Sequence, residues 1–142
     1  MAEDLDLVCA FLTHFAQEHL TEKGTFDSFG VVLDDQGKLT MVAGVLTPEY
    51  NSAEKIVRFW FGALRQAAAG KNYRAVGFCC NLLTANQTTG EKSQSVQVWL
   101  EHSDGRAQTA SFPCEKDSAK RISLGKPSSK PLEPRVFNQQ TA

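Results

Sequence analysis

Residues 95–112 read SVQVWLEHSDGRAQTASF, and the pattern in this stretch decides the fold. Every second residue of its first half is aliphatic, which places Val96, Val98 and Leu100 on one face of a β-strand. Asp104-Gly105 tolerates the positive φ angles of a tight turn, and the alternation resumes after it. The stretch therefore predicts a β-hairpin. A hairpin alone is only marginally stable, so further strands must flank it and helices must cover its apolar face.

Two segments have the spacing of amphipathic helices. Apolar residues recur every three or four positions over residues 4–20, and Gly24 is the expected stop. The second helix is predicted to begin after Asn51 as its N-cap and to end at Gly70. Its stretch IVRFWFGAL is apolar over more than half of its circumference, which is typical of a helix packed on two sides or facing a partner chain.

Three more strands are predicted from the remaining apolar runs. Residues 26–33 and 38–46 form a first hairpin whose turn needs Gly37 in the left-handed conformation. Residues 73–83, YRAVGFCCNLL, are nearly all apolar and suit a strand buried on both faces. Residues 84–94 are polar and are predicted to form the longest internal loop, where ligand contacts would be sought first.

The C-terminal part is predicted to be irregular. Pro113 is expected to end the last clear strand, and residues 122–124 form an edge strand or a docking segment. Val136-Phe137 is expected to anchor the tail to the body of the protein, and residues 138–142 to fray. Residues 1–137 would then be one domain.

The resulting element order is α-β-β-α-β-β-β, which predicts an α+β fold. In it, a single antiparallel sheet of about five strands carries two helices and an irregular C-terminal tail. The composition fits such a fold, since 42% of the 142 residues are hydrophobic and 22% are charged. A net charge of −1 argues against a nucleic-acid-binding protein, because that function depends on neutralising phosphates. No apolar run is long enough to span a membrane, and residues 1–20 lack the basic residues of a secretion signal, so a cytoplasmic protein is expected.

Motifs for metals or cofactors are missing from the sequence. The cysteines and histidines show no metal-ligand spacing, and Gly90-Glu91-Lys92-Ser93 lacks the glycine pattern of a P-loop. We therefore expect no cofactor. Cys79-Cys80 lies within the apolar run and is interpreted as a pair of reduced, buried thiols. Glu101 and His102 should leave their strand on opposite faces, so Glu101-His102-Ser103-Asp104 is interpreted as a polar hairpin tip rather than a catalytic group.

Three segments carry a resemblance to other proteins. FGVVLDDQGKL (residues 29–39), YRAVGFCCNLL (73–83) and VQVWLEHSDGRA (96–107), followed by Pro113, resemble a widespread set of small uncharacterised bacterial proteins. That set shares a strand ending in Asp and Gly and a Glu-His-x-Asp-Gly hairpin. The resemblance implies the fold and a bacterial cytosolic setting, and it implies no activity. Over residues 4–113 the element order also resembles profilin-like and roadblock/longin folds, but prolines replace the last helix of the roadblock pattern.

Three functions follow as hypotheses, and the first is favoured. A non-catalytic protein-interaction module, homodimeric through the second helix or an edge strand, would use Arg58, Phe59, Trp60 and Phe61, because large aromatic residues anchor interfaces. A small-ligand sensor would instead have a pocket between sheet and helix. Its lining would come from Tyr73, Gly77, Trp99 and His102.

A cysteine-dependent enzyme is the third hypothesis. Cys79 or Cys80 would act as the nucleophile, with His102 from a neighbouring strand as its base. Such a thiol needs a lowered pKa in a partly exposed, electropositive environment. The apolar residues around both cysteines create the opposite environment, so this is the least favoured of the three.

Overall fold

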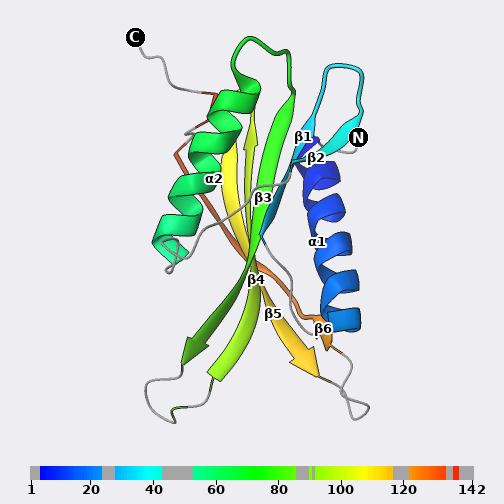
Figure 1. The fold of residues 1–142 in the computed structure, drawn as a ribbon, viewed down its shortest axis with the longest axis vertical. Coiled ribbons are helices and arrows are strands. Elements are labelled where there is room, and N and C mark those ends of the chain that lie inside the picture. Colours follow the sequence, from blue (N-terminus) through cyan, green and yellow to red (C-terminus); the bar gives the residue numbers. More distant parts are fainter. Residues whose placement is uncertain are drawn as a thin grey trace.

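The computed structural model describes residues 4–23, 28–42, 53–85, 90, 92–116, 122–133 and 136–137, and it confirms the α+β class. Two helices flank one antiparallel sheet on opposite sides (Figure 1). The strands lie in the order β2-β1-β3-β4-β5-β6, and β7 pairs with β5 next to β6. In chain order the elements are α1 (Asp4–Lys23), β1 (Phe29–Leu33), β2 (Leu39–Val42), α2 (Ala53–Ala68), β3 (Ala75–Ala85), β4 (Lys92–His102), β5 (Ala107–Lys116), β6 (Ile122–Leu124) and β7 (Ser128–Pro131).

Helix α1 covers one face of the sheet with closely packed aliphatic side chains. Its inner stripe, spaced as the sequence predicts, is fully or almost fully buried: Leu5, Val8, Leu12, Ala16 and Leu20. Gly77 of β3 lies directly beneath this stripe. A Cβ atom built on Gly77 would lie 2.7 Å from Cγ1 of Val8, so the helix can approach this closely only because residue 77 is glycine.

Helix α2 covers the other face through large aromatic side chains. Trp60 is completely buried and its indole N–H donates a hydrogen bond to the Ser28 hydroxyl at 2.9 Å. Phe61 and Phe78 are buried beside it, and their rings meet edge to face at 5.3 Å. Gly30 of β1 makes room for this layer, since an added Cβ would lie 3.0 Å from the Trp60 ring.

The C-terminal part of the sheet differs from the prediction. The sheet is six strands wide rather than five, because β6 and β7 both pair along the outer side of β5. Residues 122–124 are confirmed as an edge strand, whereas 128–131 had been assigned to an irregular tail. Pro113 does not end β5 either. Its carbonyl accepts from Gly125 N–H on the outer side of the strand, so its missing N–H also faces that side and no bond to β4 is lost.

The β3–β4 hairpin is longer than predicted. Strand β3 continues to Ala85 and β4 begins at Lys92, so much of the expected loop at residues 84–94 is strand. The loop was predicted because residues 84–94 are almost all polar and show no apolar alternation. The outer ends of β3 and β4 extend beyond the N-terminal end of α2 (Figure 1). Residues 86–89 and 91, like Gly24, Gly44 and the Asn51 cap, lie outside the described residues.

The turns follow the predicted chemistry. Gly37 has φ 83° in the β1–β2 turn and Gly105 has φ 103° in the β4–β5 turn, conformations that favour glycine. Asp34 and Asp104 accept hydrogen bonds from backbone N–H groups two residues further along, which shapes both turns. Among the described helices, none is long and apolar enough to cross a membrane.

Candidate functional site

The four interface residues predicted on α2 are divided between core and surface. Trp60 and Phe61 belong to the buried aromatic layer, in which Trp60 is fully buried and Phe61 is 8% exposed. Phe59 is half-buried. Arg58 is exposed and forms a 2.9 Å ion pair with Glu54, one turn earlier on the helix. The aromatic run that pointed to an interface is therefore mainly the core of this face.

The four predicted pocket residues lie on opposite faces of the sheet. Trp99 and Tyr73 pack with the α2-side core, whereas Gly77 lies beneath α1. His102 is also on the α1 side, where its Nε2 is 2.8 Å from Asp4 at the start of that helix. Gly77 and Trp99 both line the small cavity described below, whereas Tyr73 and His102 are not among its lining residues. The space that Gly77 leaves open is filled by Val8.

His102 joins the start of α1 to the tip of the β4–β5 hairpin. Nδ1 lies 3.1 Å from the backbone N of Asp104 and 3.3 Å from its carboxylate, and in the tautomer with the proton on Nε2 the ring donates to the Asp4 carboxylate. Arg74 adds a longer ion pair to Asp4 at 3.7 Å. The backbone N–H of Arg106, bonded to the Asp104 carboxylate, lowers the pKa of Asp104. These contacts fasten a helix to a turn.

The two adjacent thiols are buried on opposite faces. Cys79 packs in the α1-side core and Cys80 in the α2-side core. Burial raises the pKa of Cys80 to about 12 and raises that of Cys79 well above its usual value. Both thiols stay protonated at neutral pH, opposite to what a nucleophile requires. Cys79 is also four strand residues from Ala75, the partner of His102 in the sheet, a separation of about 13 Å.

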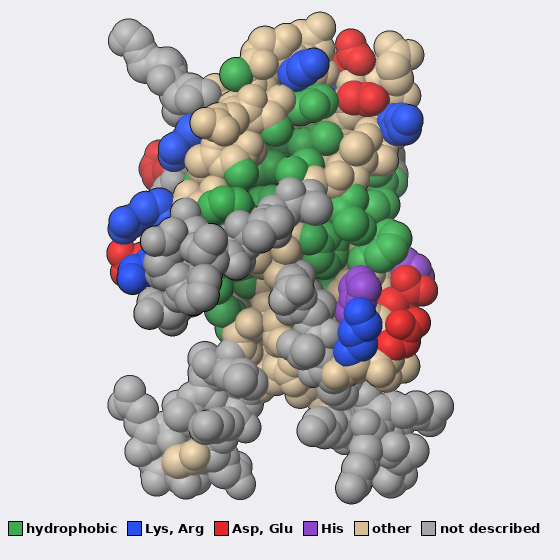
Figure 2. All heavy atoms as spheres, in the orientation of Figure 1, with side chains coloured by type: hydrophobic (Ala, Val, Ile, Leu, Met, Phe, Trp, Pro, Cys, Tyr) green, Lys and Arg blue, Asp and Glu red, His purple; other side chains and the backbone are tan. Residues whose placement is uncertain are grey.

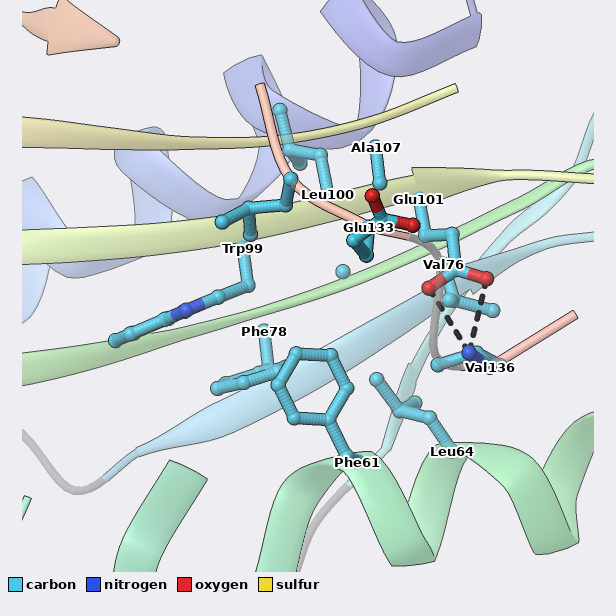
Figure 3. Close-up of a pocket in the computed structure, with 12 residues that line it drawn as sticks. Phe61, Leu64, Val76, Phe78, Trp99, Leu100, Glu101, Ala107, Glu133 and Val136 are labelled. Carbon is cyan, nitrogen blue, oxygen red and sulfur yellow. Dashed lines mark hydrogen bonds between the residues drawn. The ribbon is translucent and has the colours of Figure 1, made fainter. Parts of the chain in front are cut away.

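A small cavity lies between α2 and the sheet (Figure 3). Its volume of about 10 Å³ holds roughly one water molecule. Phe61, Phe78 and Trp99 line it from the helix and the strands, and Leu132, Glu133 and Val136 line it from the C-terminal segment. The C-terminal segment thus completes this side of the core.

Glu101 holds that segment in place. Its side chain belongs to a residue only 3% exposed, and its carboxylate accepts the backbone N–H of Val136 at 2.9 Å and of Phe137 at 2.6 Å. Figure 3 shows the carboxylate pointing at Val136. Hydrogen bonds of this kind are what make a buried carboxylate tolerable. The predicted anchor at Val136-Phe137 is confirmed. The sequence did not predict that the Glu101 carboxylate is its hydrogen-bond acceptor.

An open groove lies next to this cavity, between α2 and the long hairpin. It has a volume of about 440 Å³ and is lined by Glu54, Val57, Arg58, Phe61, Arg65, Leu82 and Trp99. Trp99 ends a stack of three rings. Its ring is 4.8 Å from that of Phe78 at an interplanar angle of 8°, and Phe78 in turn stacks on Trp60 at 6.1 Å. Spacing of three and four residues along α2 could have predicted the helical side of the groove, but not its partners on β3 and β4.

A second feature missed by the sequence analysis is an apolar strip beside α1. It consists of Leu7, Phe11 and Phe15 on α1 with Leu39 and Met41 on β2. Leu39 and Met41 pair with Leu33 and Val31, which face α1, so all five lie on one side of the sheet. Leu7 and Met41 are each 42% exposed. Figure 2 shows hydrophobic side chains over the first half of α1 and charged ones over its second half.

Comparison of the chain with protein-family models, curated proteins and solved structures found no match. No group of three or more metal-binding side chains occurs in the part of the chain that the structure describes.

Proposed function

We propose that the protein is a non-catalytic interaction module that pairs with a second copy of itself along strand β2. The observation that carries this proposal is the apolar strip. Leu7 and Met41 expose large hydrophobic side chains, and the half-buried Phe11 and Phe15 extend the same surface along α1. Apolar side chains gathered in this way favour an interaction surface.

A second copy is the occupant that the geometry of this edge favours. Among the described strands, β2 pairs with β1 alone, so its outer edge presents backbone N–H and C=O groups. An edge strand that pairs antiparallel with its own copy satisfies two-fold symmetry. The apolar strip lies beside the same edge, so the strips of the two copies would meet across the axis and bury Leu7 and Met41.

Charge does not oppose this pairing. The chain carries 15 basic and 16 acidic residues, so two copies have almost no net repulsion. The strip itself contains no charged residue. The proposal also keeps the edge-strand alternative of the sequence analysis while the burial of Trp60 and Phe61 removes support from the helix alternative. A profilin-like or roadblock-like topology and a bacterial cytosolic setting remain parts of the proposal.

The test is the absolute mass in solution, measured by light scattering on a sizing column. The wild type should be a dimer, and the double variant Leu7→Glu/Met41→Glu should be a folded monomer, because charges would be buried against their copies. Arg58→Glu is the matched control on α2 and should stay dimeric, since Arg58 is exposed on the other side of the sheet. Circular dichroism verifies that each variant is folded.

Two results would overturn the proposal. A monomeric wild type removes self-association altogether. A monomer produced by Arg58→Glu, with a dimeric Leu7→Glu/Met41→Glu variant, places the interface on α2 instead.

A further inference from the structure

We propose that the groove between α2 and the β3–β4 hairpin is a binding site for a small anionic ligand with a planar ring. The site lies on the α2 side of the sheet, away from the apolar strip, so it is independent of self-association. Three properties of the groove lead to this ligand class: its aromatic end wall, its charge and its size.

The aromatic wall suits a planar ring. Trp60, Phe78 and Trp99 form a nearly parallel stack, with interplanar angles of 16° and 8° between successive rings. Trp60 is buried, whereas Trp99 is half-buried and lines the groove. A flat ring placed against Trp99 would extend the stack by one member, an arrangement that aromatic rings favour. Val57 and Leu82 add apolar surface on either side.

The charged residues select an anion. Arg58 and Arg65 both line the groove, and their separation of seven residues places them on one face of α2, about 10 Å apart along the axis. A guanidinium group binds carboxylates and phosphates through paired hydrogen bonds. Glu54, the ion-pair partner of Arg58, also lines the groove. Its ion pair with Arg58 is exposed, and such pairs are weak enough to yield to a ligand.

The size of the groove suits a small molecule. Ligand sites commonly have volumes of about 300–1,000 Å³, and the groove has about 440 Å³. The neighbouring cavity, at about 10 Å³, has no room for such a ligand. The groove thus combines a stacking surface, two guanidinium groups and adequate space.

Calorimetric titration with 2-naphthoate and with its neutral isostere 2-naphthamide tests the proposal. We expect one saturable site for 2-naphthoate and about tenfold weaker binding of 2-naphthamide, the loss of one charge-assisted contact. Trp99→Leu should weaken 2-naphthoate about three- to tenfold through lost stacking. The double variant Arg58→Gln/Arg65→Gln should bind both compounds equally weakly.

A charge-matched control separates the groove from the overall charge of the protein. Lys55→Gln/Lys71→Gln removes the same charge from residues that do not line the groove, and it should bind 2-naphthoate like the wild type. Absence of saturable binding, equal affinity for the two compounds, or equal losses in both double variants would overturn the proposal. Leu7→Glu/Met41→Glu should bind normally, so failure of self-association and failure of the groove are distinguishable.

Discussion

The two faces of the sheet are covered in different ways. On the α1 face, glycine in β3 lets the helix press aliphatic side chains directly onto the strands, and Val8 occupies the position above Gly77. On the α2 face, Trp60, Phe61 and Phe78 fill the space between helix and sheet. The packing of α1 depends on the small residue Gly77, and the packing of α2 depends on large aromatic residues.

This difference determines where a ligand could enter. Rings stacked at 4.8 Å and 6.1 Å extend sideways from beneath α2, and the last of them, Trp99, forms a wall of the open groove. Aliphatic packing under α1 leaves its exposed apolar side chains at the flank of the helix instead, as the strip of Leu7 and Met41. The α2 side of the sheet is therefore suited to a small ligand. The edge formed by α1 and β2 is suited to a flat protein surface.

The largest effect is expected from Gly77→Ala, which tests the close approach of α1. The new Cβ would lie 2.7 Å from Val8 and 2.9 Å from the carbonyl oxygen of Trp99, and the backbone atom cannot easily move away. We expect a loss of about 3 kcal/mol in the free energy of unfolding, measured in urea. Gly30→Ala on the other face should cost only about 1 kcal/mol, because its nearest contact is 3.0 Å from a side-chain ring.

Equal losses at the two glycines would contradict the contrast between the faces. If Gly77→Ala does not fold, the double variant Gly77→Ala/Val8→Ala supplies the missing room. It should recover part of the lost stability, because the contact with the Trp99 carbonyl remains, while Gly30→Ala/Val8→Ala should be less stable than Gly30→Ala.

A smaller effect is expected at Glu101, which holds the C-terminal segment against the α2 face only. Glu101→Ala leaves the N–H groups of Val136 and Phe137 without this acceptor and should cost about 2 kcal/mol. Glu101→Gln keeps one acceptor oxygen and should cost about half as much. Hydrogen exchange at Val136 should accelerate in both variants before exchange in β1 does. Unchanged exchange at Val136 would mean that Glu101 does not hold the segment.

The local patterns in the sequence predicted most of the fold. Strict alternation defined β4, the Asp-Gly and Gln-Gly dipeptides defined the turns, and helical spacing defined both helices, because each signal reports a nearby backbone preference. The outer ends of β3 and β4 were missed because they are polar. Strand β7 was missed because its exposed residues, SSKP, have no apolar alternation and pair only through the backbone.

The candidate sites could be predicted only in part. Trp99 and Arg58 were both selected from the sequence, but for different functions. Their common groove depends on which strand lies beneath α2, which no local pattern determines. Phe59, Trp60 and Phe61 were selected as an interface because aromatic residues mark interfaces and cores alike. Leu7 and Met41 are ordinary single hydrophobic residues until the sheet brings α1 and β2 to the same side.

Cys79 and Cys80 lie on opposite faces of the sheet, so the pH dependence of stability can be compared between the two faces. The folded protein keeps Cys80 protonated up to a pKa of about 12, whereas an unperturbed thiol titrates at 9.0. Above pH 9 the unfolded state therefore binds fewer protons, and stability falls as pH rises. Between pH 8 and pH 10 the contribution of Cys80 to the fall should be about 1.4 kcal/mol.

Urea unfolding of Cys80→Ala at both pH values should show a shallower fall than the wild type by that amount. Cys79→Ala should also reduce the fall, because burial raises the pKa of Cys79 as well. The Lys and Tyr residues are the same in all three proteins, so their contributions cancel in the comparison. A fall that is identical in the wild type and both variants would mean that the thiols are accessible to water in the folded state.

The smallest effect on stability, and the sharpest contrast with binding, is expected from Glu54→Gln. Its ion pair with Arg58 is exposed on both sides, with side chains 80% and 76% accessible, so its loss should change stability by less than about 0.5 kcal/mol. The same change removes the only acidic residue among those that line the groove, and affinity for 2-naphthoate should rise about threefold. Glu22→Gln on α1 changes the net charge equally at an exposed position on the other face and should leave the affinity unchanged. If both variants raise the affinity for 2-naphthoate alike, the anion responds to the net charge of the protein. If only Glu54→Gln raises it, the anion responds to the groove, and the charges on α2 contribute to binding rather than to stability.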